Sequence, residues 1–518
     1  MQSESDRTGY LRGWTSVLIV FISNACIMIL ELVAGRIIAP NLGVSLYTWT
    51  SVIGVILAGI SLGNTLGGRI ADRWGSPRLL GLLFGLAGLT TFGVLLIDQR
   101  YWFHQTELPM LVETVSWIAI LFFIPGMILG TISPVVVKLT ISDLDRAGRT
   151  VGRIYAFGTL GSIVGTFATG FWLISWVGTY AIVLGVGAIL LLLSLIFLLG
   201  NTPSGVVVIA LVGLINIGGL IWGLSEGRIQ GPCLRETNYF CIKVRDEERE
   251  GEPVRVLILD RLVHSYTSLD DPTQLVYGYE KVYAELTAYQ DDRYGPLRTL
   301  SIGGGGYTFP KYLEAEYPKS EVDVIEIDPG VTEIAYTHMG LPADTRVQSF
   351  NEDARLYLER TPTKHYDVII GDAFDDFSVP YHLTTYGFNE RVQAWLEPHG
   401  VYVVNVIDGS YGRFIRAYVH TLQQTFDHVY VAPSTSEWRR ASRTTWVVVG
   451  TSTPLDLQAF APDTIWRQQL LSSEEVTDLL GESDPVLLTD RYAPVEQMLT
   501  PVFLNKTAGT VEKTYEQT

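Results

Sequence analysis

The stretch LRTLSIGGGGYTFPKYLEAEYPKSEVDVIEIDPG, residues 297–330, determines the predicted fold of the second half of the chain. It reads as a β-strand, a turn of four glycines, a helix and a second β-strand. Further strands and helices alternate after it, as in RVQSF, ARLYLERT, YDVIIGD, NERVQAWLE and GVYVVNVI. Two late strands, HVYVAPS and TTWVVVGT, are expected at the edge of the sheet. This alternation predicts a parallel sheet covered by helices.

A smaller unit precedes this sheet. The segments NYFCIKVRD and PVRVLILDRLVHSYT carry alternating or β-branched residues and predict a small antiparallel β-unit. A helix is expected to follow at about residues 277–289. The predicted domains are a helical membrane domain at 1–225, the β-unit with its helix at 226–290, a Rossmann-like domain at 291–455, and an extension at 456–518.

The first half is too apolar for a soluble domain. The chain of 518 residues is 47% hydrophobic with a mean hydropathy of +0.24, and residues 154–224 contain no Asp, Glu, Lys or Arg. Since about 20 apolar residues cross roughly 30 Å of hydrocarbon, the sequence predicts a multi-pass membrane domain in contact with lipid. Its seven predicted spans are Trp14–Ile38, Trp49–Leu66, Leu79–Ile97, Val115–Val137, Ile154–Trp176, Tyr180–Leu199 and Val206–Leu224.

Charge separates the two halves and excludes some functions. Residues 1–224 carry 11 basic and 9 acidic side chains, whereas residues 225–518 carry 26 and 45. A domain with a net charge of −19 repels nucleic-acid phosphates, so nucleic-acid binding is not expected. The three cysteines and eight histidines show no metal-binding spacing, so no metal site is expected.

Basic residues predict the orientation of the bundle. Arg69, Arg73 and Arg78 follow the second span, and Lys138 and Arg146 follow the fourth, so both loops are expected in the cytoplasm. Seven spans then place the second half outside the cytoplasm of a cell-membrane protein. There Cys233 and Cys241 would form a disulfide, whereas a cytoplasmic location predicts two thiols. The sequence leaves the side open.

Two further features lie in the apolar half. Gly81 with Gly85, and Gly161 with Gly165, recur at four-residue spacing, which allows close helix packing. Glu31 lies deep in the first span, where it is either a structural polar contact or a functional ionisable group. The loop GGRIADRW resembles the loop between spans two and three of major-facilitator transporters.

The candidate site lies at the tips of successive strands. The glycines at 303–306 follow the first strand and remove the Cβ atoms that would keep a ligand from the backbone. Glu326 ends the second strand, where an acidic side chain accepts hydrogen bonds from ribose hydroxyls. Asp353 follows the third strand and is placed to accept from an adenine amino group, and Asp372 and Asp375 follow the fourth. Together these residues predict an adenosine site, although each has a structural alternative as turn, surface acid or helix cap.

These residues also carry a family resemblance. LSIGGGG, DVIEID, NEDARLYL, YDVIIGDAFD and the upstream ETNYFCIKV and LDRLVHSYT resemble the spermidine synthase (polyamine aminopropyltransferase) family over residues 233–450. The whole chain, with its tail LLTDRYAPVEQML, is similar to proteins described as fused transporter/spermidine synthase.

The resemblance implies a class I methyltransferase-like fold with an N-terminal β-unit and a polyamine substrate. The implied co-substrate is decarboxylated S-adenosylmethionine, with no metal. The implied donor-binding residues are Gly303, Gly304, Gly305, Glu326, Asp353, Ala354 and His264. Asp372 is the implied general base, and Asp375 orients the amine.

Two departures from the family pattern keep alternatives open. The family loop reads GGGDG, and its aspartate grips the amino end of the donor, whereas this chain has Gly306 and Tyr307. A glutamine usual in the β-unit is replaced by His264. The alternatives are an S-adenosylmethionine-dependent methyltransferase, or a transporter or sensor that binds a polyamine or nucleoside without turnover. The sequence leaves the acceptor amine and homodimer formation undecided.

Overall fold

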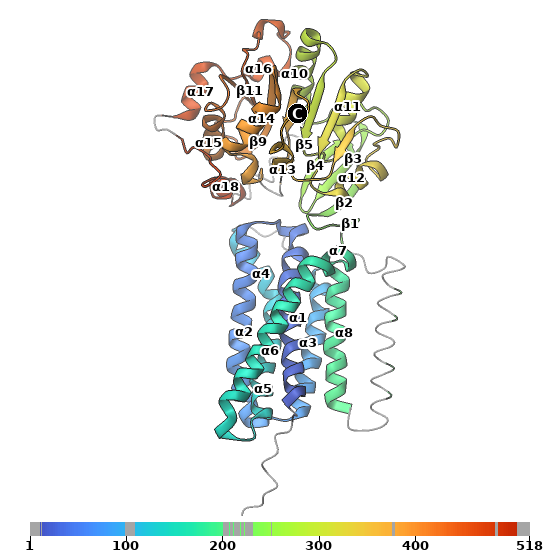
Figure 1. Ribbon diagram of the computed structural model, residues 1–518, viewed down its shortest axis with the longest axis vertical. Helices are drawn as coiled ribbons and strands as arrows, with labels where there is room; N and C mark the ends of the chain where they lie inside the picture. Colours follow the sequence, from blue (N-terminus) through green and yellow to red (C-terminus); the bar gives the residue numbers. More distant parts are fainter. Residues whose placement is uncertain are drawn as a thin grey trace, which may run out of the picture. The chain divides into compact units, whose positions relative to one another are not determined.

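The computed structural model describes residues 13–98, 109–199, 231–249, 251–374, 379–481 and 485–504, with isolated positions 11, 207, 211, 218 and 222. The chain divides into two compact units, Met1–Cys241 and Ile242–Thr518 (Figure 1). The first is a helical bundle, and the second is an α/β unit. Each is described by itself.

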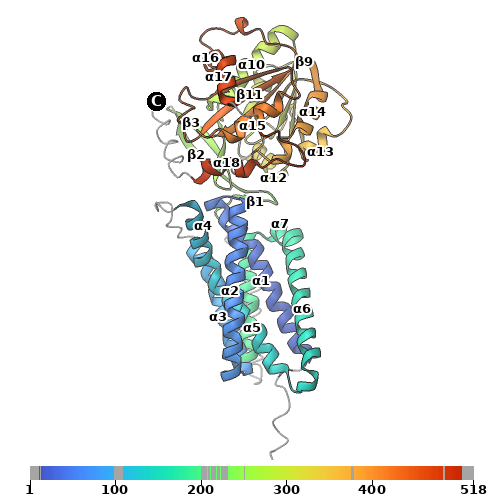
Figure 2. The same cartoon turned by 90° about the vertical axis from the view of Figure 1, so that its left-hand side faces the viewer.

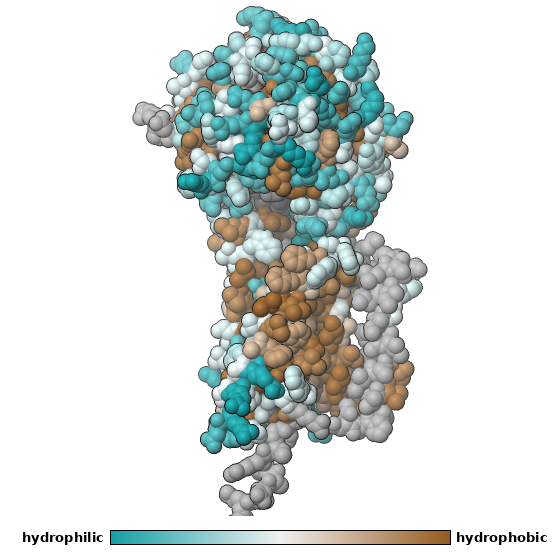
Figure 3. Space-filling model, viewed as in Figure 1, coloured by the Kyte–Doolittle hydropathy of each residue, from teal (hydrophilic) through white to brown (hydrophobic). Residues whose placement is uncertain are grey.

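Six helical segments of the first unit are long and apolar enough to cross a membrane. They are α1 (Gly13–Leu42), α2 (Leu46–Trp74), α3 (Pro77–Asp98), the segment Leu111–Thr140, the segment Leu144–Val177, and α8 (Thr179–Leu199). Each overlaps one of the first six predicted spans. The predicted seventh, Val206–Leu224, lies outside the described residues apart from isolated positions. In Figure 3, hydrophobic side chains occupy much of the middle of this unit's visible face, and hydrophilic ones gather at its lower end.

The fourth and fifth segments are not regular α-helices throughout. The fourth comprises α4 (Met110–Ile118), a π-helical turn at Ala119–Phe123 and α5 (Ile124–Thr140). The fifth begins with a 3₁₀ turn at Leu144–Arg146, continues as α6 (Ala147–Ala168), and passes through a π-helical turn at Thr169–Leu173 into α7 (Ile174–Val177). Figure 2 shows α6 beside α1, in agreement with their contacts.

The predicted loop GGRIADRWGSPR is largely helical. Helix α2 continues past the apolar run to Trp74, and only Gly75 and Ser76 separate it from α3. The backbone of Gly67 packs against Thr131 of α5 so closely that a Cβ would lie 2.7 Å from the Thr131 carbonyl oxygen. Packing against α5 therefore extends the helix beyond the point where hydropathy falls.

Close helix packing at the predicted glycines is confirmed, and it follows a repeat. Gly161 faces the carbonyl oxygen of Phe21, and Gly59 faces that of Phe123. Gly161 lies 102 positions after Gly59, and Phe123 lies 102 positions after Phe21.

Two further pairs of contacts obey the same offset of 102 residues. The contact of Gly165 with Ala25 corresponds to that of Gly63 with Met127. Likewise Gly85 packs against Ser194, and Gly187 packs against Phe92. Gly187 lies 102 positions after Gly85, and Ser194 lies 102 positions after Phe92. The first unit therefore contains two related three-helix repeats, residues 13–98 and 111–199.

The two repeats run in opposite directions through the bundle. The end of α5 lies beside the start of α1, because the Thr140 hydroxyl donates to Ser16 Oγ at 2.6 Å. The first helix of one repeat is thus antiparallel to the first helix of the other. Each repeat has three helical segments that run through the bundle. Because three is an odd number, a repeat ends on the side of the bundle opposite to its start, and the next repeat is therefore inverted.

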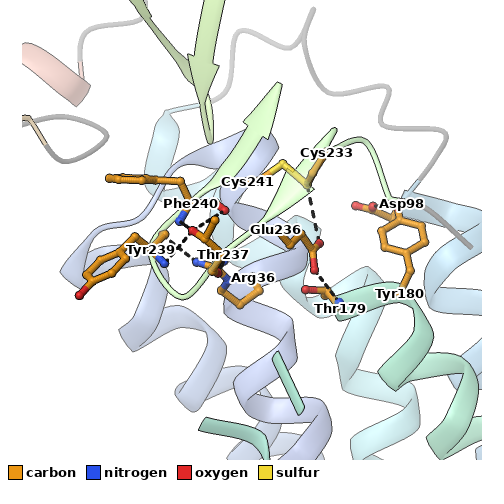
Figure 4. The surroundings of a disulfide bond; sticks show 10 residues. All are labelled: Arg36, Asp98, Thr179, Tyr180, Cys233, Glu236, Thr237, Tyr239, Phe240 and Cys241. Atoms are coloured by element: carbon orange, nitrogen blue, oxygen red, sulfur yellow. Dashed lines mark hydrogen bonds between the residues drawn. A yellow bond between two sulfur atoms is a disulfide. The ribbon is translucent and has the colours of Figure 1, made fainter. Parts of the chain in front are cut away.

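A disulfide-linked hairpin lies at one end of this unit. Cys233 and Cys241 are joined, as predicted for an oxidising location. Arg36, near the end of α1, donates to the carbonyl oxygens of Thr237 and Tyr239 within the hairpin (Figure 4). Glu236 accepts from the backbone N–H of Thr179 at 2.6 Å, at the start of α8. The hairpin is therefore fixed to the ends of two helices.

The predicted antiparallel β-unit is present as a small sheet of order β1-β2-β3-β4. Its strands are β1 (Arg235–Glu236), β2 (Cys241–Arg249), β3 (Glu252–Leu259) and β4 (Leu262–Thr267). The segment PVRVLILDRLVHSYT forms two strands, because Asp260 adopts a positive φ of 50° and the chain reverses there. Helix α10 (Gly278–Tyr294) follows.

The large sheet has the order β10-β11-β9-β8-β5-β6-β7. Strands β5 (Arg298–Ile302), β6 (Glu321–Ile325), β7 (Gln348–Phe350), β8 (Tyr366–Gly371) and β9 (Leu396–Asp408) are parallel. Strand β11 (Thr444–Thr451) is antiparallel to both β9 and β10 (His428–Pro433). The predicted Rossmann-like, class I methyltransferase-like arrangement is confirmed for this unit.

Helices pack on the two faces of the large sheet around apolar cores. The helices that connect the strands are α11 (Thr308–Glu316), α12 (Pro329–Thr337), α13 (Ala354–Leu358), α14 (Tyr386–Trp395) and α15 (Arg413–Leu422).

The C-terminal segment adds α16 (Ile465–Gln469), α17 (Ser473–Leu480) and α18 (Val495–Leu504) to this unit. Trp466 of α16 is fully buried, and both oxygens of Glu285 accept backbone N–H groups at the start of this helix. Asp490, from the tail LLTDRYAPVEQML, accepts from Thr385 Oγ1 and pairs with Arg355 at 2.7 Å. These contacts join the C-terminal segment to the helices beside the sheet.

Candidate active site

The predicted site residues follow four neighbouring strands. Strands β8, β5, β6 and β7 are adjacent and parallel, so their carboxyl ends meet at one edge of the sheet. The backbone joins these ends directly, because Asp372 N donates to Ile302 O at 2.9 Å and Gly303 N donates to Ile325 O at 2.8 Å. The sheet therefore brings the glycine loop, Glu326 and Asp372 together.

The glycine loop has a backbone that side chains would disturb. Gly303 has a positive φ of 96°, and its missing Cβ leaves room for the backbone of Asp372. Gly305 also has a positive φ, of 49°. At Gly306, a Cβ would lie 2.8 Å from the Cβ of Ser265, whose hydroxyl is hydrogen-bonded to Thr308 Oγ1 at 2.6 Å. The position where the family has an aspartate is thus closed by packing against β4.

Tyr307 ends the loop in an unusual conformation. Its φ is 56°, in the left-handed region that favours glycine, and its side chain is fully buried. The Tyr307 hydroxyl lies 3.0 Å from both Thr332 Oγ1 and Ser349 Oγ. The ring lies against Gly304, where a Cβ would meet it. Buried hydrogen bonds at the end of the side chain therefore hold a strained backbone position.

Glu326 bonds to the glycine loop itself. Its Oε2 accepts from Gly304 N at 2.8 Å and from Gly305 N at 3.4 Å, while Oε1 accepts from Asp328 N at 2.9 Å. Burial raises the pKa of this carboxyl, and the backbone donors oppose that shift. The predicted ribose acceptor is thus at the loop, and it positions the loop backbone.

Asp353 serves as the N-cap of α13. Its Oδ1 accepts from the backbone N–H groups of Arg355 and Leu356, and Oδ2 lies 3.4 Å from His382 Nε2. Ala354 is buried in the first turn of the same helix. Asp353 therefore acts as a helix cap, which was not predicted for this residue, and its second oxygen is directed to a histidine.

Asp372 is half-buried at the tip of β8. Asn405, which is buried on β9, donates from Nδ2 to Asp372 Oδ1 at 3.0 Å, and the Tyr279 hydroxyl also bonds to the carboxylate. Burial raises the pKa of Asp372 to about 7, although both hydrogen bonds oppose the shift. A carboxyl with this pKa can accept a proton near neutral pH. Asp375 lies outside the described residues.

His264 lies on β4, facing the loop. The atom nearest to a Cβ built on Gly305 is the backbone oxygen of His264, at 4.0 Å. The ring nitrogen Nδ1 lies 3.0 Å from the carbonyl oxygen of Leu262, and burial lowers the pKa of the imidazole to about 4. At neutral pH this histidine is therefore uncharged.

The sequence analysis missed several polar groups around Asp372. Glu280 and Tyr283 on α10 are 5% and 1% exposed and interact electrostatically with Asp372. Within the described residues, Glu280 Oε2, Tyr283 Oη and Asn405 Oδ1 are buried without a hydrogen-bond partner. The only sequence signals were a glutamate at the start of a helix and an asparagine inside an apolar strand. Neither residue indicates a site from the sequence alone, because the two are brought near Asp372 only in the folded structure.

Comparisons with known proteins find relatives for this part of the chain. Residues 283–457 match the Spermine/spermidine synthase domain family. This domain of the chain is therefore similar to the spermidine synthase family. A polyamine aminopropyltransferase from Vibrio vulnificus is 37% identical over 117 residues, which cover 22% of this chain and 39% of that protein. The human eEF1A lysine and N-terminal methyltransferase is 29% identical over 125 residues, covering 22% of this chain and 18% of that protein.

Solved structures also align with part of this chain. A probable spermidine synthase from Corynebacterium glutamicum aligns with a TM-score of 0.42 and 23% identity, over 48% of this chain and 93% of that one. This chain spans less than two thirds of the length of the curated relatives named above. The similarity to the family therefore concerns the domain at residues 283–457.

Proposed function

We propose that this chain transfers an aminopropyl group from decarboxylated S-adenosylmethionine to a small amine or polyamine. The observation that carries the proposal is Asp372, a carboxyl with a pKa of about 7 beside a glycine loop at the tip of β8. An ammonium cannot attack because its lone pair is occupied by a proton. A carboxylate of this basicity holds the amine and accepts its proton.

The reaction needs only this proton transfer and correct positioning. The amine nitrogen forms a bond to the propyl carbon beside sulfur as the carbon–sulfur bond breaks. The sulfonium becomes neutral methylthioadenosine, and the amine proton passes to Asp372. Asp375 is proposed to orient the amine, as the family resemblance implies. Glu326 is proposed to accept from the ribose, and Asp353 with Ala354 to lie at the adenine.

The activity test uses the full-length protein with the decarboxylated donor and a panel of diamines and triamines. Release of methylthioadenosine that depends on the amine is the expected result. Asp372→Asn removes the proton acceptor while keeping the shape of the side chain, and it should lower kcat by about 10²–10⁴-fold. Absence of methylthioadenosine with every amine would overturn the proposal.

A methyltransferase is the second candidate for the same site. It is favoured by Gly306, which leaves the donor amine without the family aspartate, and by the similarity to a human methyltransferase. Lys311, buried in α11, also lies in this region and would attract a donor that keeps its carboxylate. Calorimetric titration distinguishes the candidates, because tighter binding of S-adenosylmethionine than of its decarboxylated form would favour methyl transfer.

We also propose that the helical unit spans the cell membrane in contact with lipid. Its six long apolar segments support this, and its inverted three-helix repeats have the architecture found in many secondary transporters. A transport role is the third candidate function. It predicts uptake of labelled spermidine into proteoliposomes, and no uptake above that of empty liposomes would contradict transport while leaving the membrane proposal intact.

We place the α/β unit outside the cytoplasm. The support comes from the two ends of the bundle. One end carries Arg73, Lys138 and Arg153. The helix ends that carry them lie together, because Lys138 pairs with Asp72 and Arg153 lies over the ring of Trp14. The disulfide hairpin is bonded at the other end, through Arg36 and Thr179. Basic ends favour the cytoplasm, and disulfides persist outside it.

Labelling of intact cells tests this orientation. With Cys26 replaced by Ala, Asn238→Cys places a free thiol at an exposed position of the hairpin, which a membrane-impermeant maleimide should label without permeabilisation. Ser76→Cys, at the basic end between α2 and α3, is the matched control and should react only after permeabilisation. The reverse pattern would place the α/β unit in the cytoplasm.

A further inference from the structure

In the glycine loop, Gly306 stands where the family pattern has an aspartate. An aspartate at 306 would collide with Ser265, which is held by its hydrogen bond to Thr308. The loop itself is therefore unable to supply an acidic side chain toward the donor. Any carboxylate that holds the amino end of the donor must come from a neighbouring element.

Glu280 lies on such an element, at the third position of α10. Its carboxylate accepts the backbone N–H of Tyr277, which caps the helix. This bond engages one oxygen, whereas Oε2 is buried and has no hydrogen-bond partner within the described residues. A helix cap requires only one oxygen, so the cap does not explain why the second is buried and unsatisfied.

Electrostatic interactions link Glu280 to Asp372 and to Lys311. On one side it interacts with Asp372, whose other neighbours Tyr283 and Asn405 also leave polar atoms unsatisfied. On the other side it interacts with Lys311, whose ammonium donates to the carbonyl oxygen of Met339. The Cε atom of Met339 is 3.1 Å from a Cβ built on Gly306. Glu280 thus interacts electrostatically with the proposed base and with a lysine whose partner, Met339, packs against Gly306.

The unsatisfied atoms around Asp372 can all accept hydrogen bonds. The amide oxygen and a carboxylate oxygen only accept, and the tyrosine hydroxyl can accept as well as donate; buried polar atoms without partners are rare in native structures. A ligand that satisfies them together must supply several N–H donors. A protonated primary amine supplies three such donors and a positive charge.

We propose that Glu280 holds the ammonium end of the donor's aminopropyl chain, replacing the aspartate that the glycine loop lacks. This inference rests on the proposed aminopropyl transfer. The ammonium lies between the carboxylates of Glu280 and Asp372 and displaces no existing hydrogen bond of Glu280 Oε2. A donor that kept its carboxylate would bring a negative group toward Glu280, so the same residue selects for the decarboxylated form.

Charge supports this arrangement. Burial raises the pKa of Glu280 to about 8, and the nearby charge of Asp372 adds to the shift, while Lys311 and Lys281 oppose it. The empty site therefore holds Glu280 mostly protonated at neutral pH. Binding of an ammonium favours the charged carboxylate, so donor binding should release a proton from the wild-type protein.

The test compares two ligands that differ only in the chain. Decarboxylated S-adenosylmethionine carries the aminopropyl group, and methylthioadenosine lacks it. Glu280→Gln keeps an oxygen for the Tyr277 cap but removes the charge. It should raise the Kd for the decarboxylated donor by roughly tenfold or more, as expected for a lost charge-assisted hydrogen bond, and leave the Kd for methylthioadenosine unchanged. The proton release on donor binding, measured by calorimetry in two buffers, should also disappear.

Glu285→Gln is the matched control on the same helix. Glu285 accepts two backbone N–H groups of α16, so this change should lower stability without altering the preference between the two ligands. If Glu280→Gln weakens both ligands equally, or neither, the inference is wrong although aminopropyl transfer stands. If the wild-type protein binds S-adenosylmethionine more tightly than the decarboxylated donor, both the inference and the proposed function fail.

Discussion

Asn405 Nδ2 donates a hydrogen bond of 3.0 Å to Asp372 Oδ1, across the junction of two adjacent parallel strands. The bond stabilises the charged form of a carboxylate whose pKa is raised by burial to about 7. Asn405 therefore sets how much of the proposed base is ionised at a given pH, without needing to touch the substrate.

Removing this donor should move the pH profile. Because the hydrogen bond lowers the pKa of Asp372, its loss in Asn405→Leu should raise that pKa further. The proposed base works when deprotonated, so activity rises with pH through about 7 in the wild type and at higher pH in the variant. The measurement is kcat/KM against pH between 5 and 9.

Thr444→Val provides a matched control for this profile. Thr444 is buried on the neighbouring strand β11, and its hydroxyl has no hydrogen-bond partner in the described part of the chain. The midpoint of its profile should equal that of the wild type. A shift to lower pH in Asn405→Leu would be incompatible with the assigned role.

The Tyr307 hydroxyl should contribute to stability rather than to nucleoside binding. Tyr307→Phe removes its bonds to Thr332 and Ser349 and leaves buried groups unsatisfied, at a cost of about 1–3 kcal/mol. Thermal unfolding of the full-length protein should show a lower Tm. Tyr336→Phe, which alters an exposed ring on α12, is the control and should leave the Tm unchanged. Equal Tm values for all three proteins would contradict this account.

The repeat in the helical unit predicts paired effects. Gly161→Ala and Gly59→Ala each place a methyl group against the backbone of the facing helix, so both should destabilise the bundle by roughly 1–3 kcal/mol. Gly68→Ala meets nothing within 4 Å and serves as the control. Thermal stability in detergent is the measurement. A loss of stability at only one of the two equivalent glycines would argue against equivalent packing.

Local patterns predicted much of the fold because they reflect burial. The apolar runs of the first half and the strand–glycine–helix order of the second each appear where expected. The end of α2 was not predicted, because hydropathy falls after Leu66 while packing of Gly67 against Thr131 continues the helix. The inverted repeat was not predicted, because few residues of the first repeat are identical to the residues 102 positions later in the chain.

The candidate site was only partly predictable for a related reason. Glu326 and Asp372 directly follow parallel strands, and residues in that position lie at the edge of the sheet where ligands bind. Glu280 and Asn405 follow no such rule, since α10 and β9 meet β8 only through tertiary packing. The role of Asp353 as an N-cap is local chemistry that was not predicted for this residue.

The most direct test of aminopropyl transfer follows the carbon atoms. The full-length protein is incubated with an amine and a decarboxylated donor that carries distinguishable isotopes in its propyl chain and its S-methyl group. Mass spectrometry of the amine product should find the propyl label, in amounts equal to the methylthioadenosine formed, and Asp372→Asn should form neither. Recovery of the methyl label on the amine instead would contradict the account.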